Sequence, residues 1–432
     1  MQPGRRRFLR NTSLAAGALA AAGFGYPLKS QATADEAALV EVDTAQGRLR
    51  GERQGGVVTF KGVPYAGSVS GKNRFKAAPP LEPWDGVRNA LSFGPHAPQP
   101  DAASFDLTTD ADENCLVLNV WTPDLGGAQG RPVMVYLHGG GFDAGSGEVA
   151  GGGTLARTQD VVVVTVNHRL GLLGFLYLGE LGGDEYASSG NQGALDLVVA
   201  LQWIHDNIES FGGDPSRVMI FGEAGGGGKV SALYTMPAAH GLFHRACIES
   251  APSILLTKPA DATATARAVL AQLRVRPDQL YKLAQVSAAR FIELQDAGHF
   301  GPVVDGHFVT QHPLDPTASP VSASIPLLAG AKRDDTVMVR NRMDLIAERK
   351  AAQGGAPVYK YLCSYQSKAK RTTIDYLQRL AAARNMSEMW ATFARTGRPA
   401  ARGQPEWPAF SADKRLTMIL DAKCRVVSDP YG

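Results

Sequence analysis

The sequence predicts an α/β fold built on a doubly wound, mostly parallel sheet, and three observations support this. Short runs that are apolar throughout recur along the chain, as at Val161–Val166, and such runs are typical of strands buried on both faces. Longer segments of helical periodicity separate them, as at Gly193–Ser210. A glycine-rich bend follows the run Val218–Phe221 and leads into small residues. Strands that alternate with helices at this spacing favour parallel pairing.

Further segments predict an N-terminal sheet, a helical cap, a late helix and several short strands. Leu39–Phe60 alternates apolar and polar residues around glycines, which predicts a small antiparallel sheet at the N-terminal end. Lys258–Gln295 is alanine-rich, charged and helical in period, which indicates a cap over the sheet. A late helix is expected at Ser387–Ala394. Further short β runs are Leu116–Trp121, Val133–Leu137, Ala246–Ile248, Ile325–Ala329 and Val358–Ser364.

Composition restricts the class of protein. The chain has 432 residues, of which 44% are hydrophobic and 20% charged, as expected of a globular protein with a large core. Without the five basic residues among the first 34, the net charge of +3 becomes slightly negative. This balance gives no reason to expect nucleic acid or an anionic membrane as a partner. Four scattered cysteines are too few for a disulfide framework or a zinc site, and no metal or other cofactor is expected.

The first residues have the features of an export signal. Arg5–Arg10 fits a twin-arginine pattern, Leu14–Phe24 is a short apolar stretch, and Ala32–Ala34 offers a small-residue cleavage site. The apolar stretch is shorter than the ~20 residues that a membrane-spanning helix needs. We therefore expect a signal peptide over residues 1–34, a single domain over 35–432, a periplasmic or extracellular location and no stable membrane insertion.

The glycine-rich bend is the most informative stretch. Gly222 and Gly226 lie two residues before and two residues after Ala224, between a β run and a small-residue helix start. This layout predicts a nucleophile elbow, which in ester hydrolases carries serine at its centre. The methyl group of Ala224 cannot attack a carbonyl, so the nucleophile is missing. We expect Glu223 to be a buried acid held by backbone donors near the helix start, with a contact to a charged or polar ligand group as the alternative, and Lys229 to reach the surface.

Besides the elbow, the chain contains a series of ordered motifs: Phe60–Ala66, Glu113–Pro123, His138–Phe142, Asn167–Gly171, Gly190–Asn191 with Asp196, Phe211–Pro215, Phe243–Ala246, Pro302–Gly306 and Phe393–Gly397. In this order they resemble the type-B carboxylesterases, the α/β-hydrolases that include bacterial esterases and the cholinesterases. The resemblance implies an α/β-hydrolase fold with an N-terminal β-meander and a helical cap, a Ser–Glu–His triad, an oxyanion hole and ester hydrolysis through an acyl-enzyme.

Two parts of this machinery have counterparts here. The resemblance assigns the oxyanion hole to the backbone N–H groups of Gly140, Gly141 and Gly225, and glycine lets the backbone approach a developing oxyanion. It places Asp335 at the position of the acid, where aspartate can orient a histidine if the backbone compensates for its shorter reach. A solvated acidic loop after a strand is the alternative interpretation of Asp335.

The catalytic histidine is not found. The family's base follows its acid, whereas all nine histidines of this chain precede Asp335, at positions 96, 138, 168, 205, 240, 244, 299, 307 and 312. Residues 361–371 run almost directly into the late helix, so the segment that should carry the base looks deleted, and a second shortening is expected between Thr336 and Ala347. Without a base, even a restored serine is a poor nucleophile. A triad rebuilt from Ser250 with His299 or His307 needs several coincidences of geometry.

These residues predict a carboxylic-ester hydrolase by descent, shortened after residue 336, in which turnover is lost or nearly lost. The alternative is a non-catalytic protein that binds a small ester or carboxylate in the former acyl pocket. A different reaction, polarised by the oxyanion hole without serine, stays open, and an altered reading frame is another explanation of the shortening. A monomer is favoured, with a small molecule as its partner.

Overall fold

The computed structural model describes residues 37–100, 105, 107–126, 130–149, 151–251, 253–364 and 373–431, with the side chains of 373–380 left out. The expected signal peptide, residues 1–34, lies outside this part of the chain. Among the helices of the described ranges, none combines the length and the apolar character needed to cross a membrane.

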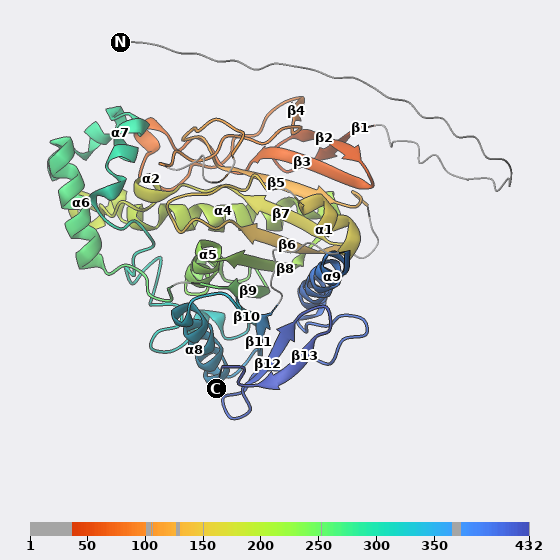
Figure 1. Ribbon diagram of the computed structural model, residues 1–432. Coiled ribbons are helices and arrows are strands. Elements are labelled where there is room, and N and C mark those ends of the chain that lie inside the picture. Colours follow the sequence, from red (N-terminus) through yellow and green to blue (C-terminus); the bar gives the residue numbers. More distant parts are fainter. Residues whose placement is uncertain are drawn as a thin grey trace, which may run out of the picture. The chain divides into compact units, whose positions relative to one another are not determined.

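Thirteen strands of the described chain form one sheet (Figure 1). The order is β1-β2-β3-β5-β7-β6-β8-β9-β10-β11-β12-β13, with β4 beside β2. Along this order, pairing is parallel from β7 to β12 and antiparallel at both ends, whereas β4 pairs parallel with β2. The strands are β1 (Ala38–Asp43), β2 (Arg48–Gln54), β3 (Val57–Pro64), β4 (Val87–Asn89), β5 (Val117–Thr122), β6 (Arg131–Leu137), β7 (Val162–Val166), β8 (Gly213–Glu223), β9 (Arg245–Glu249), β10 (Leu327–Lys332), β11 (Val358–Cys363), β12 (Leu416–Leu420) and β13 (Arg425–Ser428).

Helices cover both faces of the sheet, which confirms the doubly wound prediction (Figure 1). One face packs against α4, α5 and α8, and the other against α1 and α9. Among these residues the α-helices are α1 (Gly152–Gln159), α2 (Gly171–Phe175), α3 (Gly179–Gly182), α4 (Gln192–Asn207), α5 (Gly225–Leu233), α6 (Pro259–Leu273), α7 (Ala288–Glu293), α8 (Val337–Gln353) and α9 (Thr373–Thr396). The expected cap comprises α6, the 3₁₀ segment η7 (Pro277–Gln285) and α7.

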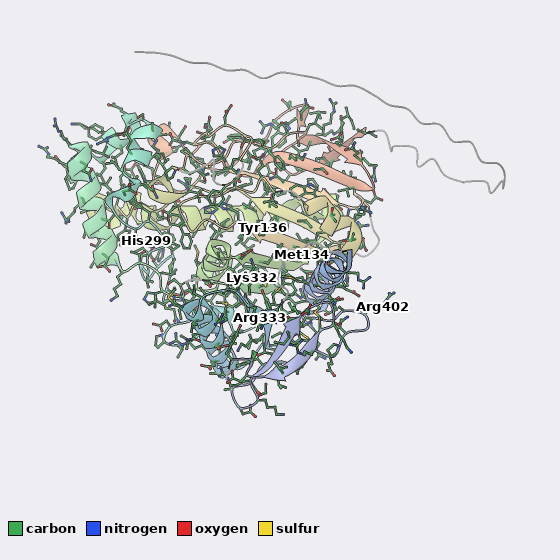
Figure 2. The ribbon with its side chains drawn as sticks, in the orientation of Figure 1. Met134, Tyr136, His299, Lys332, Arg333 and Arg402 are labelled. Carbon is green, nitrogen blue, oxygen red and sulfur yellow. The ribbon has the colours of Figure 1, made fainter. Side chains whose placement is uncertain are left out.

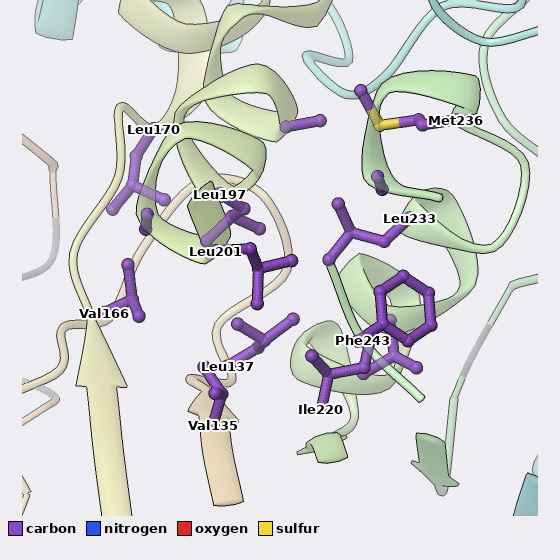
Figure 3. Packing of buried hydrophobic residues seen from close by; sticks show 14 of the residues in the cluster. Val135, Leu137, Val166, Leu170, Leu197, Leu201, Ile220, Leu233, Met236 and Phe243 are labelled. Atoms are coloured by element: carbon purple, nitrogen blue, oxygen red, sulfur yellow. The ribbon is translucent and has the colours of Figure 1, made fainter. Parts of the chain in front are cut away.

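The central strands bury both of their faces because apolar residues occupy odd and even positions alike. On β6, Val135 and Leu137 join the cluster that includes α4 and α5, whereas Met134 joins the cluster on the α9 face. Figure 3 shows the first cluster, in which Leu197 of α4 and Leu233 of α5 meet the strands. This double burial explains the continuous apolar runs in the sequence.

Two ion pairs with little exposure account for motif residues to which the sequence assigned no role. Arg169, just after β7, holds Asp196 of α4 through Nη2–Oδ1 at 2.6 Å and Nε–Oδ2 at 2.8 Å, and their side chains are 4% and 1% exposed. Arg74 holds Glu113 through Nε–Oε2 at 2.6 Å and Nη2–Oε1 at 2.5 Å. Through these pairs the motif residues Arg169, Asp196 and Glu113 connect a strand end, a helix and the loops beside them.

The C-terminal third holds elements that the sequence did not predict. The strands β12 and β13 form an antiparallel pair at the edge of the sheet. The helix α8 spans 17 residues in the region where a shortening was expected. Its buried stripe is narrow, with Met343, Ile346 and Ala347 among many charged residues, and Val337 and Met338 at its start are exposed. That weak periodicity explains why α8 was missed.

Candidate functional site

The bend around Ala224 has the strand–turn–helix geometry predicted for it. β8 ends at Glu223, α5 begins at Gly225, and Ala224 between them has φ 52° and ψ −113°, a conformation that strains any residue with a Cβ. The two flanking glycines are required, because a Cβ atom on Gly222 would lie 2.5 Å from the carbonyl carbon of Gly226 and one on Gly226 only 2.1 Å from the Leu137 oxygen. A methyl group therefore occupies the tip of a tight, strained turn.

The glycines assigned to the oxyanion hole lie next to this turn. Gly140 and Gly141 follow β6 with φ values of 86° and 64°, which favour glycine. A Cβ atom on Gly225 would lie 2.1 Å from the backbone nitrogen of Gly141, so the loop and the start of α5 are in direct backbone contact. Within the described residues, no acceptor binds the N–H groups of Gly140, Gly141 or Gly225. Three unoccupied donors thus lie close to Ala224.

Asp335 lies beyond the end of β10 and is half-buried, unlike a freely solvated acid. Its Oδ2 accepts hydrogen bonds from Ser250 Oγ at 2.7 Å and from the Lys332 N–H at 2.8 Å. Ser250 follows β9 in a left-handed conformation, with φ 51°. The neighbouring Glu249 accepts a hydrogen bond through its backbone oxygen from the Ala224 N–H at 2.9 Å. Asp335 is therefore connected to the turn through Ser250, and its catalytic role remains a prediction.

No histidine completes a triad. All nine histidines fall within the described ranges, and none hydrogen-bonds Asp335 or Ser250. His307 packs edge-on against Phe308, with ring centroids 4.5 Å apart, and the His299 ring lies near Gly301. The structure therefore does not assemble the alternative triad of Ser250 with either histidine. In the same part of the chain, no group of three His, Cys, Asp or Glu side chains could hold a metal ion.

Lys229 is buried, so the expectation that it reaches the surface is wrong. Its Nζ donates to the His138 carbonyl oxygen at 2.7 Å and lies 3.2 Å from His138 Nδ1. The His138 ring stacks on His168 with centroids 5.1 Å apart. Burial holds the pKa of the Lys229 amine well below its ordinary value and lowers the pKa of both imidazoles. The signal was in the sequence, because α5 is apolar or small on every side, which is typical of a buried helix.

A cavity of about 390 Å³ lies beside the turn on the α9 face of the sheet. Met134 and Tyr136 of β6 and Trp390 of α9 form part of its apolar wall, and Lys332 lies at the end of β10 (Figure 2). Glu223 points into this cavity and forms an ion pair with Lys332, with 47% of its side chain exposed. The expectation of a buried Glu223 held by backbone donors is therefore wrong, since its partner comes from a distant strand.

Glu249 lines the same cavity and is largely buried. Its Oε2 accepts a hydrogen bond of 2.9 Å from the Tyr361 hydroxyl, and its Oε1 lies 3.9 Å from Lys332 Nζ. Burial raises the pKa of the Glu249 carboxyl from its ordinary 4.5 to about 7. Tyr361 opposes this shift because its hydroxyl favours the ionised carboxylate. Below pH 7 this carboxyl is therefore neutral in the folded protein.

The substitution Glu249→Gln should flatten part of the pH dependence of stability. Between pH 4.5 and 7 the folded state keeps a proton that the unfolded state releases, so Glu249 lowers stability as pH rises through this window, by up to about 3 kcal/mol. Urea unfolding at pH 5 and pH 8 measures this effect. The free energy of unfolding of Glu249→Gln, minus that of the unmodified chain, should be larger at pH 8 than at pH 5. Glu82→Gln, at an exposed position, is the matched control. Equal pH slopes for Glu249→Gln and the unmodified chain would contradict the expectation.

Comparisons with known proteins agree with this geometry. Residues 38–353 match the model of the carboxylesterase family. A para-nitrobenzyl esterase of Bacillus subtilis is 32% identical over 476 residues, covering 90% of this chain and 96% of its own length. A phenmedipham hydrolase of Pseudarthrobacter oxydans is 38% identical over 311 residues, covering 68% of this chain and 61% of its own length. The crystal structure of a Geobacillus stearothermophilus carboxylesterase superposes with a TM-score of 0.82 at 33% identity, covering 91% of this chain and 98% of that one.

The length of the Bacillus match bears on the shortened segments. It spans 476 aligned positions, more than the 432 residues of this chain, so the relative contains residues that have no counterpart here. The match includes most of both proteins, 90% of this chain and 96% of the relative. The chain is therefore a member of the carboxylesterase family, with the α/β-hydrolase fold.

Proposed function

We propose that this chain is a carboxylesterase-family protein whose ester hydrolysis is lost or reduced to a trace. The observation that carries the proposal is Ala224 at the tip of the turn. Acyl transfer through a covalent intermediate needs an oxygen or sulfur nucleophile at that point. The neighbouring side chain, Glu223, instead forms an ion pair with Lys332, and the nearby hydroxyl of Ser250 donates to Asp335.

The histidines give the second support. A serine hydroxyl becomes a strong nucleophile only beside a base, and no imidazole contacts Asp335 or Ser250 in the described chain. What remains is the oxyanion hole and ligand binding, which alone accelerate hydrolysis by roughly 10³–10⁴ over water in hydrolases stripped of their triads. Such a rate lies far below that of an ordinary esterase.

The same arrangement favours a second function, binding of a small ester or carboxylate without turnover. Three backbone N–H groups near Ala224 have no acceptor in the described residues, and Gly222 and Glu223 of the same turn line a cavity of about 390 Å³. A carboxylate oxygen accepts hydrogen bonds from backbone donors more strongly than a neutral carbonyl does. The para-nitrobenzyl esterase of Bacillus subtilis is named for an ester, and we extend that chemical class to the ligand here.

Hydrolysis of p-nitrophenyl acetate and butyrate tests the first proposal. The purified chain and its Ala224→Ser variant should both stay far below the rate of an ordinary esterase, because a serine without a base stays a poor nucleophile. Circular dichroism and thermal unfolding establish that both proteins are folded. Turnover by the unmodified chain at the rate of an ordinary esterase would overturn the proposal, and recovery in Ala224→Ser would reveal a base and refute the loss of the histidine.

Calorimetric titration with butyrate tests the binding function. Butyrate should bind the unmodified chain, and Gly225→Ala should abolish binding, because the new methyl group would fall 2.1 Å from the Gly141 nitrogen, between two donors. Gly228→Ala is the matched control in the same helix, since its methyl group would meet only Phe142, at 3.7 Å. Equal binding by Gly225→Ala and Gly228→Ala would exclude the oxyanion hole as the binding site.

A further inference from the structure

A second cavity, of about 450 Å³, lies on the α8 face of the last three strands. Its floor is apolar: Leu362 of β11 pairs with Ile419 of β12, and Val427 of β13 completes the surface. Three arginines, Arg333, Arg340 and Arg425, and the ring of Tyr431 form its walls. Side chains two apart on a strand share a face, so Arg425 and Val427 point the same way.

Within the described part of the chain, the three arginines have no carboxylate partner. Among the described residues none of them forms an ion pair, and no acidic side chain lines the cavity. Three acids of the same region are engaged elsewhere, because Asp344 binds Lys360 and both Glu348 and Asp429 bind Arg415. The cavity therefore concentrates positive charge that the described side chains do not neutralise.

Two of the side chains are held in place before any ligand arrives. Arg340 Nη1 donates to the backbone oxygens of Arg333 at 3.0 Å and Asp335 at 2.6 Å, and its guanidinium lies 5.0 Å from the Tyr431 ring centroid. The Tyr431 hydroxyl is buried and has no hydrogen-bond partner in the described chain. A buried donor without an acceptor is costly, so this hydroxyl provides an unmet hydrogen-bonding group.

We propose that this tri-arginine cavity binds an organic anion, with a carboxylate or phosphate head held by Arg333, Arg340 and Arg425 and a small apolar body on the floor formed by Leu362, Ile419 and Val427. Planar guanidinium groups match both head groups through paired N–H donors. A concave apolar surface with a few convergent polar groups is the usual form of a small-molecule site. The Tyr431 hydroxyl supplies a further donor to the head group.

This site is separate from the turn at Ala224. The loop after β10 lies between them, with the Asp335 carboxylate bound to Ser250 and the Asp335 backbone oxygen bound to Arg340. In Figure 2 Arg333 follows Lys332 at the end of β10, so neighbouring residues serve the two cavities. The proposal does not depend on whether the chain hydrolyses or binds esters.

Titration calorimetry of the full chain with octanoate tests whether the tri-arginine cavity binds an organic anion. Octanoate should bind, whereas octanol, which has the same chain without the charge, should bind at least tenfold more weakly, as expected when a charged hydrogen-bonded group is removed. Octyl phosphate in a parallel titration distinguishes the head groups: tighter binding assigns the site to phosphates, and weaker binding to carboxylates. Binding of neither anion, or equal binding of octanol, would overturn the proposal.

Variants locate the site. Arg333→Gln and Arg425→Gln should each weaken binding of the preferred anion about tenfold, whereas Arg402→Gln, on the α9 side (Figure 2), should not change it. Tyr431→Phe should weaken binding several-fold without loss of thermal stability, because its hydroxyl makes no bond in the free protein. Equal anion affinities of the Arg333→Gln and Arg402→Gln variants would refute the site. So would a Tyr431→Phe protein that binds the anion as tightly as the unmodified chain but has lower thermal stability.

Discussion

Replacing Asp196 by alanine should lower the free energy of unfolding by about 3–5 kcal/mol, because it leaves the Arg169 charge buried without its partner. Arg169 is only 4% exposed, and Asp196 accepts three hydrogen bonds from it: two from the guanidinium and one, at 3.0 Å, from the backbone N–H. The remaining acceptors of the guanidinium, the Lys76 carbonyl and the Gln192 amide oxygen, are neutral. Urea unfolding at pH 7 measures the loss.

The control for this experiment is an ion pair at the surface. Asp278 pairs with Arg276, and both side chains are more than 60% exposed. Asp278→Ala should leave stability nearly unchanged, since exposed pairs are solvated and screened. Equal losses for Asp196→Ala and Asp278→Ala would show that burial of the Arg169 pair contributes nothing, and would contradict the structural role assigned to these motif residues.

Gly226→Ala should destabilise the protein by about 3 kcal/mol or more, above the usual cost of overpacking. The new methyl group would lie 2.1 Å from the Leu137 carbonyl oxygen, and the obstacle is the backbone of a central strand, which no side-chain rotation can relieve. The start of α5 must then move away from the end of β6. Thermal and urea unfolding measure the loss, and butyrate binding should disappear with it.

Gly228→Ala is the matched control because it makes the same substitution two residues later in α5. Its methyl group would meet only the Phe142 ring, at 3.7 Å, which is ordinary contact distance. Alanine in a helix interior is favoured over glycine by about 0.5–1 kcal/mol, so Gly228→Ala should be slightly stabilising. A Gly226→Ala protein as stable as Gly228→Ala would mean that α5 does not pack against β6 as the structure has it.

The sequence was sufficient for the framework of this protein. The continuous apolar runs predicted the strands from β5 to β11, and Gly193–Ser210 predicted α4, because these segments bury both faces or a broad stripe. The spacing of Gly222, Ala224 and Gly226 predicted the strained turn, since that bend leaves no room for other residues at the glycine positions. The ordered motifs predicted the family.

Other features depended on contacts between distant segments. Lys229 is covered by the loop after β6, and its partner His138 is 91 residues away in sequence. Glu223 pairs with Lys332, 109 residues away. The small and apolar neighbours of Lys229 in α5 indicated that it is buried, although its charge suggested a surface position. The partners of Lys229 and Glu223 could not be predicted, because local patterns contain no information about which strand ends adjoin. The same applies to the three arginines, which come from a loop, a helix and an edge strand.

The sequence by itself determined that the turn carries Ala224 instead of serine and that every histidine precedes Asp335, because residue identity and order do not depend on folding. Only the tertiary structure decided that Asp335 bonds Ser250 and no imidazole, that three backbone donors adjoin the turn, and that Arg333, Arg340 and Arg425 surround one cavity. Parallel strands join residues far apart in the chain at one edge of a sheet, and their order in space cannot be read from local periodicity.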